Sequence, residues 1–407
     1  MSTDQEAPGC PVHFDHYDYA LQDDPYPTYA RLRREAPLYH NEEHDFWVMS
    51  RHEDIHKAFR TDGVYSNRMG VSLDESAWNE HAHVVMSFLG MDPPEQTRLR
   101  KLVSRGFTPK RVAEMEPQIR RLCNIYLEPS LAKGEFDWIT DFAGKFPMDV
   151  ISEMLGVPPA DRDELRRLAD LLVHREHGLR DVPRVGFEAS MALFAYYADL
   201  IAERRRSPGD DLVTALLMTE DDDGDRMTDG ELTAFLFLMV VAGNETTTKL
   251  LGNAVFNITR HPEQRDAVFA DVGLVTPWIE ETLRYDASSQ LLARHTLEDV
   301  TIDGTTCPAG SKLLINIGSA NHDEVVFTEP EEYDILRDKA ELAKHIAFGG
   351  GRHFCLGANL ARLEANIALE ELVSRCSSIE AEHDSAQRFY SANVRGFASL
   401  PVRVTRR

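Results

Sequence analysis

One cysteine in a glycine-rich stretch carries the strongest chemical signal in this sequence. Residues 348–357 read FGGGRHFCLG, and a helical pattern begins at Cys355. Glycine lets a backbone bend tightly and approach its neighbours closely, so backbone N–H groups and the positive end of the following helix dipole stabilise a thiolate without a side-chain base. Such a thiolate is an iron ligand that favours O–O bond cleavage. A buried, inert thiol is the alternative, and we expect it at Cys123 and Cys376.

The same ten residues resemble the haem-binding loop of the cytochrome P450 superfamily, whose pattern is F-x-x-G-x-[HR]-x-C-x-G. Its fixed positions are matched by Phe348, Gly351, His353, Cys355 and Gly357. The next residues, 358–364, read ANLARLE and resemble the same segment in bacterial members of the superfamily. The resemblance implies haem b as the cofactor, with Cys355 as the iron ligand. It also implies a monooxygenase that uses two electrons and O₂ to insert one oxygen atom into an organic substrate.

The longest predicted helix is expected to cross the domain beside this haem. It starts at Thr228, which forms a T-x-x-E capping box with Glu231, and it ends near Arg260, before Pro262. The segment from Leu232 to Val241 is apolar on nearly all sides, which is typical of a buried helix. The expected fold is therefore mainly α with small β-sheets, in a single domain with one long helix over a buried haem.

Residues 242–247 of this helix, AGNETT, combine three features that weaken a helix. Interior glycine costs about 1 kcal/mol relative to alanine, threonine can bond to the preceding turn, and a buried carboxylate is costly unless paired. These conflicts predict a functional distortion, and the stretch resembles the family's [AG]-G-x-[DE]-T-[TS] oxygen-activation motif. Ala242 and Gly243 would then form a gap that admits oxygen, while Glu245 and Thr246 carry protons inward. The alternative is a polar patch facing a neighbouring helix.

A third motif is expected to stabilise the fold. Residues 281–284, ETLR, resemble the family's E-x-x-R, and their place between the oxygen motif and the cysteine loop distinguishes them from the same spacing at Glu164 and Arg167. Arg337 is the expected third member of a trio with Glu281 and Arg284. The three charges would satisfy one another where burial is otherwise costly.

The two propionates of a haem require cations, and the candidates are Arg100, Arg294 and His353. Arg100 lies in a segment that resembles the family's helix beside the haem. Gln96 stands there in place of the histidine of many relatives, which puts one propionate contact in doubt. His322 likewise stands where arginine is commoner.

Composition limits the possible functions. The chain has 407 residues and a net charge of −24, which argues against nucleic-acid binding and against docking on anionic lipid. Its five scattered cysteines indicate a reducing environment rather than a disulfide framework. No secretory signal is visible, and the most apolar stretch, 232–243, is shorter than the roughly 20 residues of a membrane span. We expect a cytoplasmic, monomeric protein with a disordered N-terminus at 1–12 and a catalytic domain at 13–407.

Hydrophobic periodicity predicts the remaining elements. The predicted helices are Tyr26–Glu35, Glu53–Arg60, Thr97–Phe107, Val112–Leu131, Asp161–Val173, Arg184–Arg206, Pro262–Val268, Trp278–Tyr285 and Cys355–Ser374. The predicted strands are Phe46–Ser50, Val300–Ile302 and Lys312–Ile317.

The substrate cavity is predicted to have an apolar lining. Its candidate residues are Met69, Val71, Leu73, Val84, Met86, Phe88, Leu238, Val241, Leu291, Leu292 and Phe397. A mostly apolar lining favours a terpenoid, steroid, fatty acyl or polyketide-like substrate. Plain core packing is the alternative for each residue. The segment 174–183 lacks periodicity and is a candidate mobile lid.

The expected electron donors are a ferredoxin and its reductase. Residues 98–111 contain six basic side chains and no acid, and Arg98, Lys101 and Arg105 share one helix face. This basic stripe would steer an acidic carrier toward the cysteine; an ordinary solvated face is the alternative. The acidic loop 220–226 suits a solvated turn better than a calcium site, because Gly230 occupies the last ligand position.

Two other functional classes remain compatible with the motifs. One is a non-catalytic haem protein that senses a gas or recruits partners, against which the intact Glu245–Thr246 pair argues. The other is a haem-thiolate enzyme that isomerises or dehydrates, or uses peroxide directly. Oxygen consumption coupled to substrate turnover distinguishes these classes.

Overall fold

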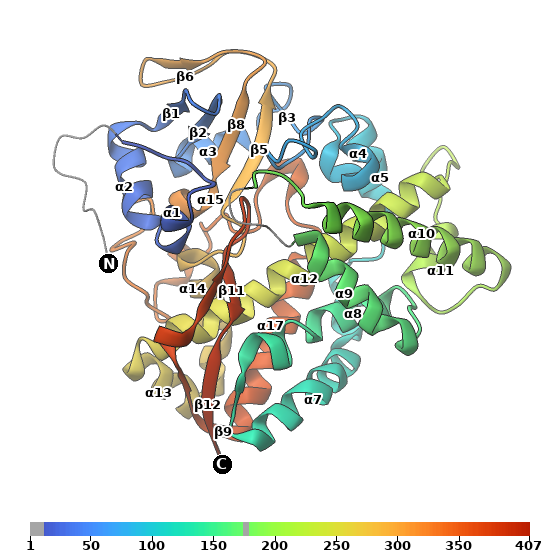
Figure 1. Ribbon diagram of the computed structural model, residues 1–407, viewed down its shortest axis with the longest axis vertical. Helices are drawn as coiled ribbons and strands as arrows, with labels where there is room; N and C mark the ends of the chain where they lie inside the picture. The colour runs from blue at the N-terminus through green and yellow to red at the C-terminus, as the bar shows by residue number, and fades with distance from the viewer. Residues whose placement is uncertain (1–11, 174–178) are drawn as a thin grey trace.

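A single long helix runs through the middle of the molecule (Figure 1). The computed structural model describes residues 12–173 and 179–407, and this helix, α12, spans Asp229–Thr259. The Thr228 hydroxyl accepts the N–H of Glu231 at 3.2 Å, and the Glu231 carboxylate accepts the N–H of Thr228 at 2.8 Å. The predicted capping box and central position are therefore confirmed, and most side chains of α12 are buried.

The other helices surround α12. Their bounds are α1 (Tyr19–Asp23), α2 (Tyr26–Glu35), α3 (His52–Ala58), α4 (His83–Met86), α5 (Glu95–Ser104), α6 (Pro109–Glu114), α7 (Glu116–Lys133), α8 (Phe146–Met154), α9 (Arg162–Val173), α10 (Arg184–Arg206), α11 (Leu212–Leu217), α13 (Pro262–Ala270), α14 (Val275–Tyr285), α15 (Ile317–Ala320), α16 (Lys339–Leu342) and α17 (Ala358–Arg375). The predicted helix 112–131 is instead two helices, because Pro117 suits the first turn of a new helix better than an interior. The helix after the cysteine begins at Ala358 rather than at Cys355.

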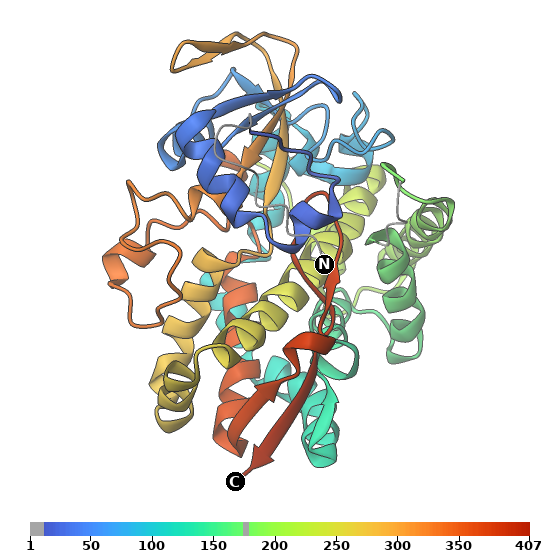
Figure 2. The ribbon, with the colours of Figure 1, turned by 60° about the vertical axis from the view of Figure 1, so that its left-hand side comes forward.

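The described residues contain twelve short strands in small sheets, as the expected fold class requires. They are β1 (Leu38–Asn41), β2 (Phe46–Met49), β3 (Tyr65–Ser66), β4 (Glu135–Asp137), β5 (Leu291–Thr296), β6 (Val300–Ile302), β7 (Thr305–Cys307), β8 (Lys312–Asn316), β9 (Cys376–Ala381), β10 (Gln387–Phe389), β11 (Gly396–Ser399) and β12 (Pro401–Arg406). The largest sheet has the order β1-β2-β8-β5-β3, and a three-stranded sheet has the order β4-β12-β9. These two sheets lie at opposite ends of the molecule (Figure 2).

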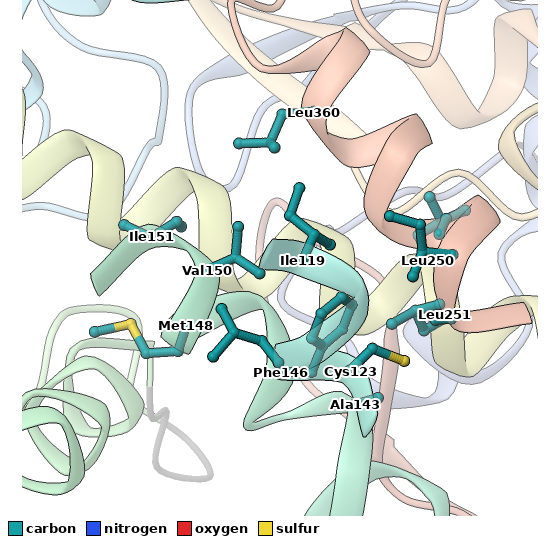
Figure 3. Packing of buried hydrophobic residues seen from close by; sticks show 14 of the residues in the cluster. Ile119, Cys123, Ala143, Phe146, Met148, Val150, Ile151, Leu250, Leu251 and Leu360 are labelled. Carbon is teal, nitrogen blue, oxygen red and sulfur yellow. The ribbon is translucent and has the colours of Figure 1, made fainter. Parts of the chain in front are cut away.

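The main core lies where α7, α8, α12 and α17 meet (Figure 3). Cys123 is fully buried there beside apolar side chains such as Phe146 and Leu251. Burial raises the pKa of the Cys123 thiol, and it also raises the pKa of the buried Cys376 thiol. Both groups therefore favour the neutral, unreactive thiol.

A buried ion cluster ties α14 to the segment that leads to the cysteine loop. Arg284 donates to Glu281 at 2.6 Å, and Arg337 Nε lies 3.3 Å from the same carboxylate. Arg284 also donates to the carbonyl oxygens of Asn321, Pro330 and Glu332. The trio is therefore assembled, and its hydrogen bonds offset the desolvation of three charges.

Close packing against α3 gives the cysteine loop its shape. Gly351 has φ +59°, and a Cβ at this position would lie 1.8 Å from the carbonyl oxygen of Phe59. The N–H of Cys355 donates to the Phe348 carbonyl at 2.9 Å. On the α5 side, the amide of Gln96 donates to the Arg352 carbonyl at 2.9 Å. The backbone of the loop is thus held on one side by the Phe59 carbonyl and on the other side by the Gln96 side chain.

Helix α10 is the one described helix with enough length and apolar character to cross a membrane, judged by composition alone. A third of that apolar stretch is buried inside the fold, and α10 packs against α9 and α12. We therefore describe it as an element of the fold.

Glu281→Gln should lower the free energy of unfolding by about 3–5 kcal/mol, because it leaves two buried guanidinium groups with reduced charge compensation. The matched control is Glu164→Gln, which breaks the ion pair between Glu164 and Arg167, two exposed residues with the same spacing. Urea unfolding measures both variants. Equal, small effects of the two substitutions would contradict a stabilising role for the buried cluster.

Gly351→Ala should strongly reduce the haem content of the purified protein, because the new Cβ collides with the Phe59 carbonyl and the backbone is left-handed. Gly230→Ala, in the first turn of α12, is the control, since a Cβ there meets nothing within 4 Å. Haem absorbance per polypeptide is the measurement. Wild-type haem content in Gly351→Ala would show that the loop tolerates a different path.

Candidate functional site

A cavity of about 740 Å³ lies between the middle of α12 and the cysteine loop before α17. It extends to the segment before α5, to α10, and to the start of β5. Aliphatic and aromatic side chains dominate its wall, and Cys355, Thr246 and Arg294 are among the polar residues that border it. The elements that carry the three sequence motifs therefore border one cavity.

Cys355 opens onto this cavity, although the thiol lies deep in the protein. Burial is the largest influence and raises its pKa, while the Gly357 N–H and the positive charges of Arg100 and Arg362 act in the opposite direction. The expected N–H donor to sulfur is thus present at Gly357. Protein groups alone lessen the cost of a thiolate, and a metal cation at the sulfur is what makes such an anion stable.

Three basic side chains gather at one edge of the cavity. Arg100 Nη1 and His353 Nδ1 are buried with no hydrogen-bond partner, and neither Arg100 nor Arg294 forms an ion pair within the described part of the chain. Burial lowers the pKa of Arg294 to about 10. Burial, followed by the charges of Arg294 and Arg100, lowers the pKa of His353 to about 3. Arg100 and Arg294 are buried cations, which are costly without anions, so these two arginines, with the neutral His353 beside them, fit the carboxylates of a large cofactor.

Gly357 provides a second test of whether a haem fits. A Cβ added to Gly357 meets nothing within 4 Å, and the residue borders the cavity next to Cys355. The missing side chain therefore leaves open space beside the sulfur. Together with the unpaired bases, this space matches a flat, doubly anionic group such as haem b.

Helix α12 forms one wall of the cavity, and it does not open at Ala242 and Gly243 as the sequence predicted. Helix α12 is continuous through residues 242–247. The Thr246 hydroxyl donates to the Ala242 carbonyl at 2.7 Å, within the helix. A Cβ on Gly243 would lie 2.4 Å from Ile151 Cδ1, so close packing with α8 explains this glycine. The expected gap is corrected to an intact helix, on which Ala242 and Thr246 face the cavity.

Glu245 is buried at the border of the cavity and has a partner that sequence reasoning missed. Lys249 Nζ lies 3.1 Å from Glu245 Oε2, one helical turn further along α12. An acid four residues before a lysine on a helix is a recognisable pairing signal. It was overlooked because Lys249 lies outside the oxygen motif.

Not all of the candidate substrate residues border the cavity. Those that do are Val71, Val84, Met86, Phe88, Leu238, Val241 and Leu292. Leu291 faces away from Leu292 into a core cluster because successive strand residues point to opposite faces. Phe397 packs against Phe256 in the main core, where the two ring centroids lie 4.4 Å apart. Leu73 belongs to the same core cluster as Leu291. Met69 does not border the cavity.

The sequence also missed several polar residues that border the cavity. Ser288 is buried with a hydroxyl that has no partner, and Asn393 borders the cavity from the loop before β11. Both belong to connecting segments without hydrophobic periodicity, so no local pattern indicated them. Of the candidate lid, residues 174–178 lie outside the described residues, and Asp181 accepts two hydrogen bonds from Ser76.

Two departures from the family pattern have structural partners. Gln96 holds the cysteine loop through its bond to Arg352, so it contributes to the loop rather than to the cation cluster. His322 bonds to Glu331 at 3.0 Å and to the Tyr285 carbonyl at 2.7 Å, and its ring stacks on Tyr26.

The basic stripe on α5 is less free than the sequence suggested. The acidic loop 220–226 folds over it, so Lys101 pairs with Asp222, and Arg98 pairs with Glu231 and lies 4.0 Å from Asp221. Arg105 and Arg111 are exposed, and neither has an ion-pair partner in residues 12–173 or 179–407. The described residues contain no group of three or more metal-ligating side chains, in this loop or elsewhere.

Comparison with known proteins agrees with this arrangement. Residues 180–404 match the family model "Cytochrome P450". The chain is 53% identical over 393 residues to "Putative cytochrome P450 123" of Mycobacterium tuberculosis, covering 97% of both chains. The solved structure of CYP109Q5 from Chondromyces apiculatus is 35% identical with a TM-score of 0.87, covering 97% of this chain and 99% of that one.

A further solved structure, CYP109E1 from Bacillus megaterium in complex with corticosterone, is 31% identical. It matches with a TM-score of 0.83 over 94% of this chain and 99% of its own. These relatives match nearly the whole length of the chain, and the family model matches residues 180–404, more than half of it. The chain therefore belongs to the cytochrome P450 family of monooxygenases, whose cofactor is haem b.

Proposed function

We propose that this monooxygenase oxidises a compact, apolar molecule of about steroid size. The observation that carries this proposal is the cavity, which is mainly apolar and must hold both the haem and the substrate in about 740 Å³. Such a site binds ligands mostly by burying apolar surface, while a few polar groups fix their orientation. Ser288, whose hydroxyl has no partner, is one such group and fits a substrate hydroxyl or carbonyl. One relative of the fold was solved with corticosterone.

Residues of this chain are assigned to hold the haem as follows. Cys355 supplies the sulfur ligand, and Phe348, Gly351 and Gly357 shape the loop around it. The unpaired bases Arg100, Arg294 and His353 bind the propionates. When bound, the haem supplies the activation of O₂ and the transfer of one oxygen atom to the substrate.

Glu245 and Thr246 are assigned to proton delivery on the α12 side of the cavity. The Thr246 hydroxyl borders the cavity, and its oxygen can accept a hydrogen bond there while the hydroxyl donates to the Ala242 carbonyl. Glu245 is the adjacent carboxylate, and it is buried at the same wall. A hydroxyl next to an acid can pass protons inward without opening the cavity to bulk water.

We also propose that an acidic ferredoxin docks beside the cysteine loop. Helix α5 is tied to that loop by Gln96 and Arg100, which donate to the carbonyls of Arg352 and Phe354. The exposed Arg105 and Arg111 follow on this side of the molecule and remain unpaired among the described residues. Positive charge here attracts an acidic partner even though the whole protein is acidic.

A panel of probe compounds tests the substrate class. Testosterone and corticosterone should shift the Soret band and be converted to hydroxylated products, because both fit an apolar cavity. Testosterone glucuronide is the matched control, since its charged sugar cannot be buried without a partner. Tighter binding of the glucuronide than of testosterone would contradict the proposed substrate class.

Thr246→Ala should leave probe binding nearly unchanged while the product formed per reductant consumed falls several-fold, because proton delivery is impaired and peroxide is released. Thr248→Ala is the matched control on the same helix, since the Thr248 hydroxyl bonds to the Ala143 carbonyl at 2.9 Å, away from the cavity. Product and consumed reductant are quantified together. Equal coupling in all three proteins would remove Thr246 from the mechanism.

Reversing Arg105 and Arg111 to glutamate should slow ferredoxin-driven turnover by about tenfold at low salt and weaken its salt dependence. Peroxide-driven turnover should hardly change, because no carrier docks in that reaction. Arg206→Glu, an exposed residue at the end of α10, serves as the control. A matching loss in the peroxide-driven reaction would mean that the two arginines support the structure rather than docking.

A further inference from the structure

Lys249 is a buried lysine that no role described above uses. It lies on α12, its side chain is 4% exposed, and it does not border the cavity. Its ammonium lies 3.1 Å from Glu245 Oε2 and donates to the Phe397 carbonyl at 3.3 Å. The same ammonium lies 3.8 Å from the centre of the Phe389 ring. These contacts tie Glu245 to the C-terminal hairpin formed by β10 and β11.

The hairpin is shaped around this lysine. A Cβ on Gly396 would lie 2.6 Å from Lys249 Cβ and 2.7 Å from Lys249 Cδ, so the first residue of β11 must lack a side chain for Lys249 to fit. A buried ammonium is costly unless an opposite charge compensates it. Glu245 supplies that charge, and the carbonyl and the ring supply further stabilisation. The site is thus built to hold a cation at this point.

The Lys249 ammonium is the counter-charge for a region that contains two acidic side chains, Glu245 and Asp170. On α9, which packs against α12, Asp170 is close enough for the charge of Glu245 to act on it. Burial and the negative charge of Glu245 raise the pKa of Asp170 to about 6, while Lys249 and Arg166 act in the opposite direction. Lys249 is the one cation that pairs with Glu245 among the described residues. Without it, a buried carboxylate would face a second acid and no counter-charge.

We infer that Lys249 is a positioning residue that keeps Glu245 ionised at the cavity wall and thereby sets its ability to pass protons. This inference rests on the proton-delivery role proposed for Glu245. Because Lys249 does not border the cavity, its replacement changes the charge on Glu245 without changing a substrate contact.

Infrared difference spectroscopy of the holoenzyme tests the charge state without a substrate. Lys249→Met keeps the length of the side chain and removes its charge, so a protonated carboxyl band should appear at neutral pH. In difference spectra against wild type, that band should be absent from the double variant Lys249→Met with Glu245→Gln. Absence of the band from Lys249→Met would overturn the inference. Lys249→Arg should restore the wild-type spectrum, because it restores a cation.

Coupling of product formation to reductant consumption, with the best testosterone-type probe, tests the consequence. Lys249→Met should lower coupling several-fold, because the Glu245 carboxylate loses its counter-charge. The double variant should couple as poorly as Glu245→Gln alone. Additive losses in the double variant would instead mean that Lys249 acts only by supporting the hairpin, and would overturn the inference.

Arg388→Met is the matched structural control. Arg388 is a cation of the same hairpin that lies 4.1 Å from the Phe397 ring centre and does not contact Glu245. It should lower thermal stability and leave coupling unchanged. Impaired coupling in Glu245→Gln with normal coupling in Lys249→Met overturns this inference alone. Normal coupling in Glu245→Gln overturns the proposed role of Glu245 as well.

Discussion

The contact between the cysteine loop and helix α3 is the interaction on which the rest of the site depends. A sulfur ligand must be presented at one point in an apolar interior, where a thiolate is costly. Backbone packing at Gly351, where a side chain would collide with the Phe59 carbonyl, gives the loop one allowed path. The hydrogen bond from the Cys355 N–H to the Phe348 carbonyl closes that path around the sulfur. The opposite wall is the continuous helix α12, and the cavity lies between the two.

Charge is distributed around this cavity in three separate arrangements. The Glu281–Arg284–Arg337 cluster is internally neutralised and supports the approach to the loop. Arg100, Arg294 and His353 lack anions among the described residues, so binding of a doubly anionic cofactor stabilises the folded protein. Glu245 and Lys249 form a pair on the cavity wall. The first cluster thus stabilises the fold, the second is proposed to bind the cofactor, and the third is proposed to supply protons.

Much of this architecture could be predicted from sequence because its signals are local. The start of α12 follows from the Thr228–Glu231 capping box, and the cysteine loop from one continuous motif. Features that depend on distant segments could not be predicted. Asp222 of the acidic loop 220–226 pairs with Lys101, and Glu231 of α12 pairs with Arg98, through contacts that no local pattern shows. Gly243 was interpreted as a gap because its packing partner, Ile151, is far away in the sequence.

Errors in the predicted cavity lining have the same origin. Leu291 and Leu292 are equally apolar, and only the direction of β5 decides which one faces the cavity. Phe397 lies near the C-terminus, and its place in the core depends on the packing of the β10–β11 hairpin against α12. Composition identifies such residues as buried, but it does not distinguish a cavity wall from a core.

The central claim is that Cys355, and no other cysteine, is the sulfur ligand of the haem. The most direct test is the Soret band of the reduced, carbon monoxide-bound protein. Wild type and Cys123→Ser should both give the band typical of thiolate ligation, because Cys123 is buried in the core with a raised pKa. Cys355→Ser should lose that band. A band typical of histidine ligation in freshly prepared wild type, or an unchanged thiolate band in Cys355→Ser, would contradict the account.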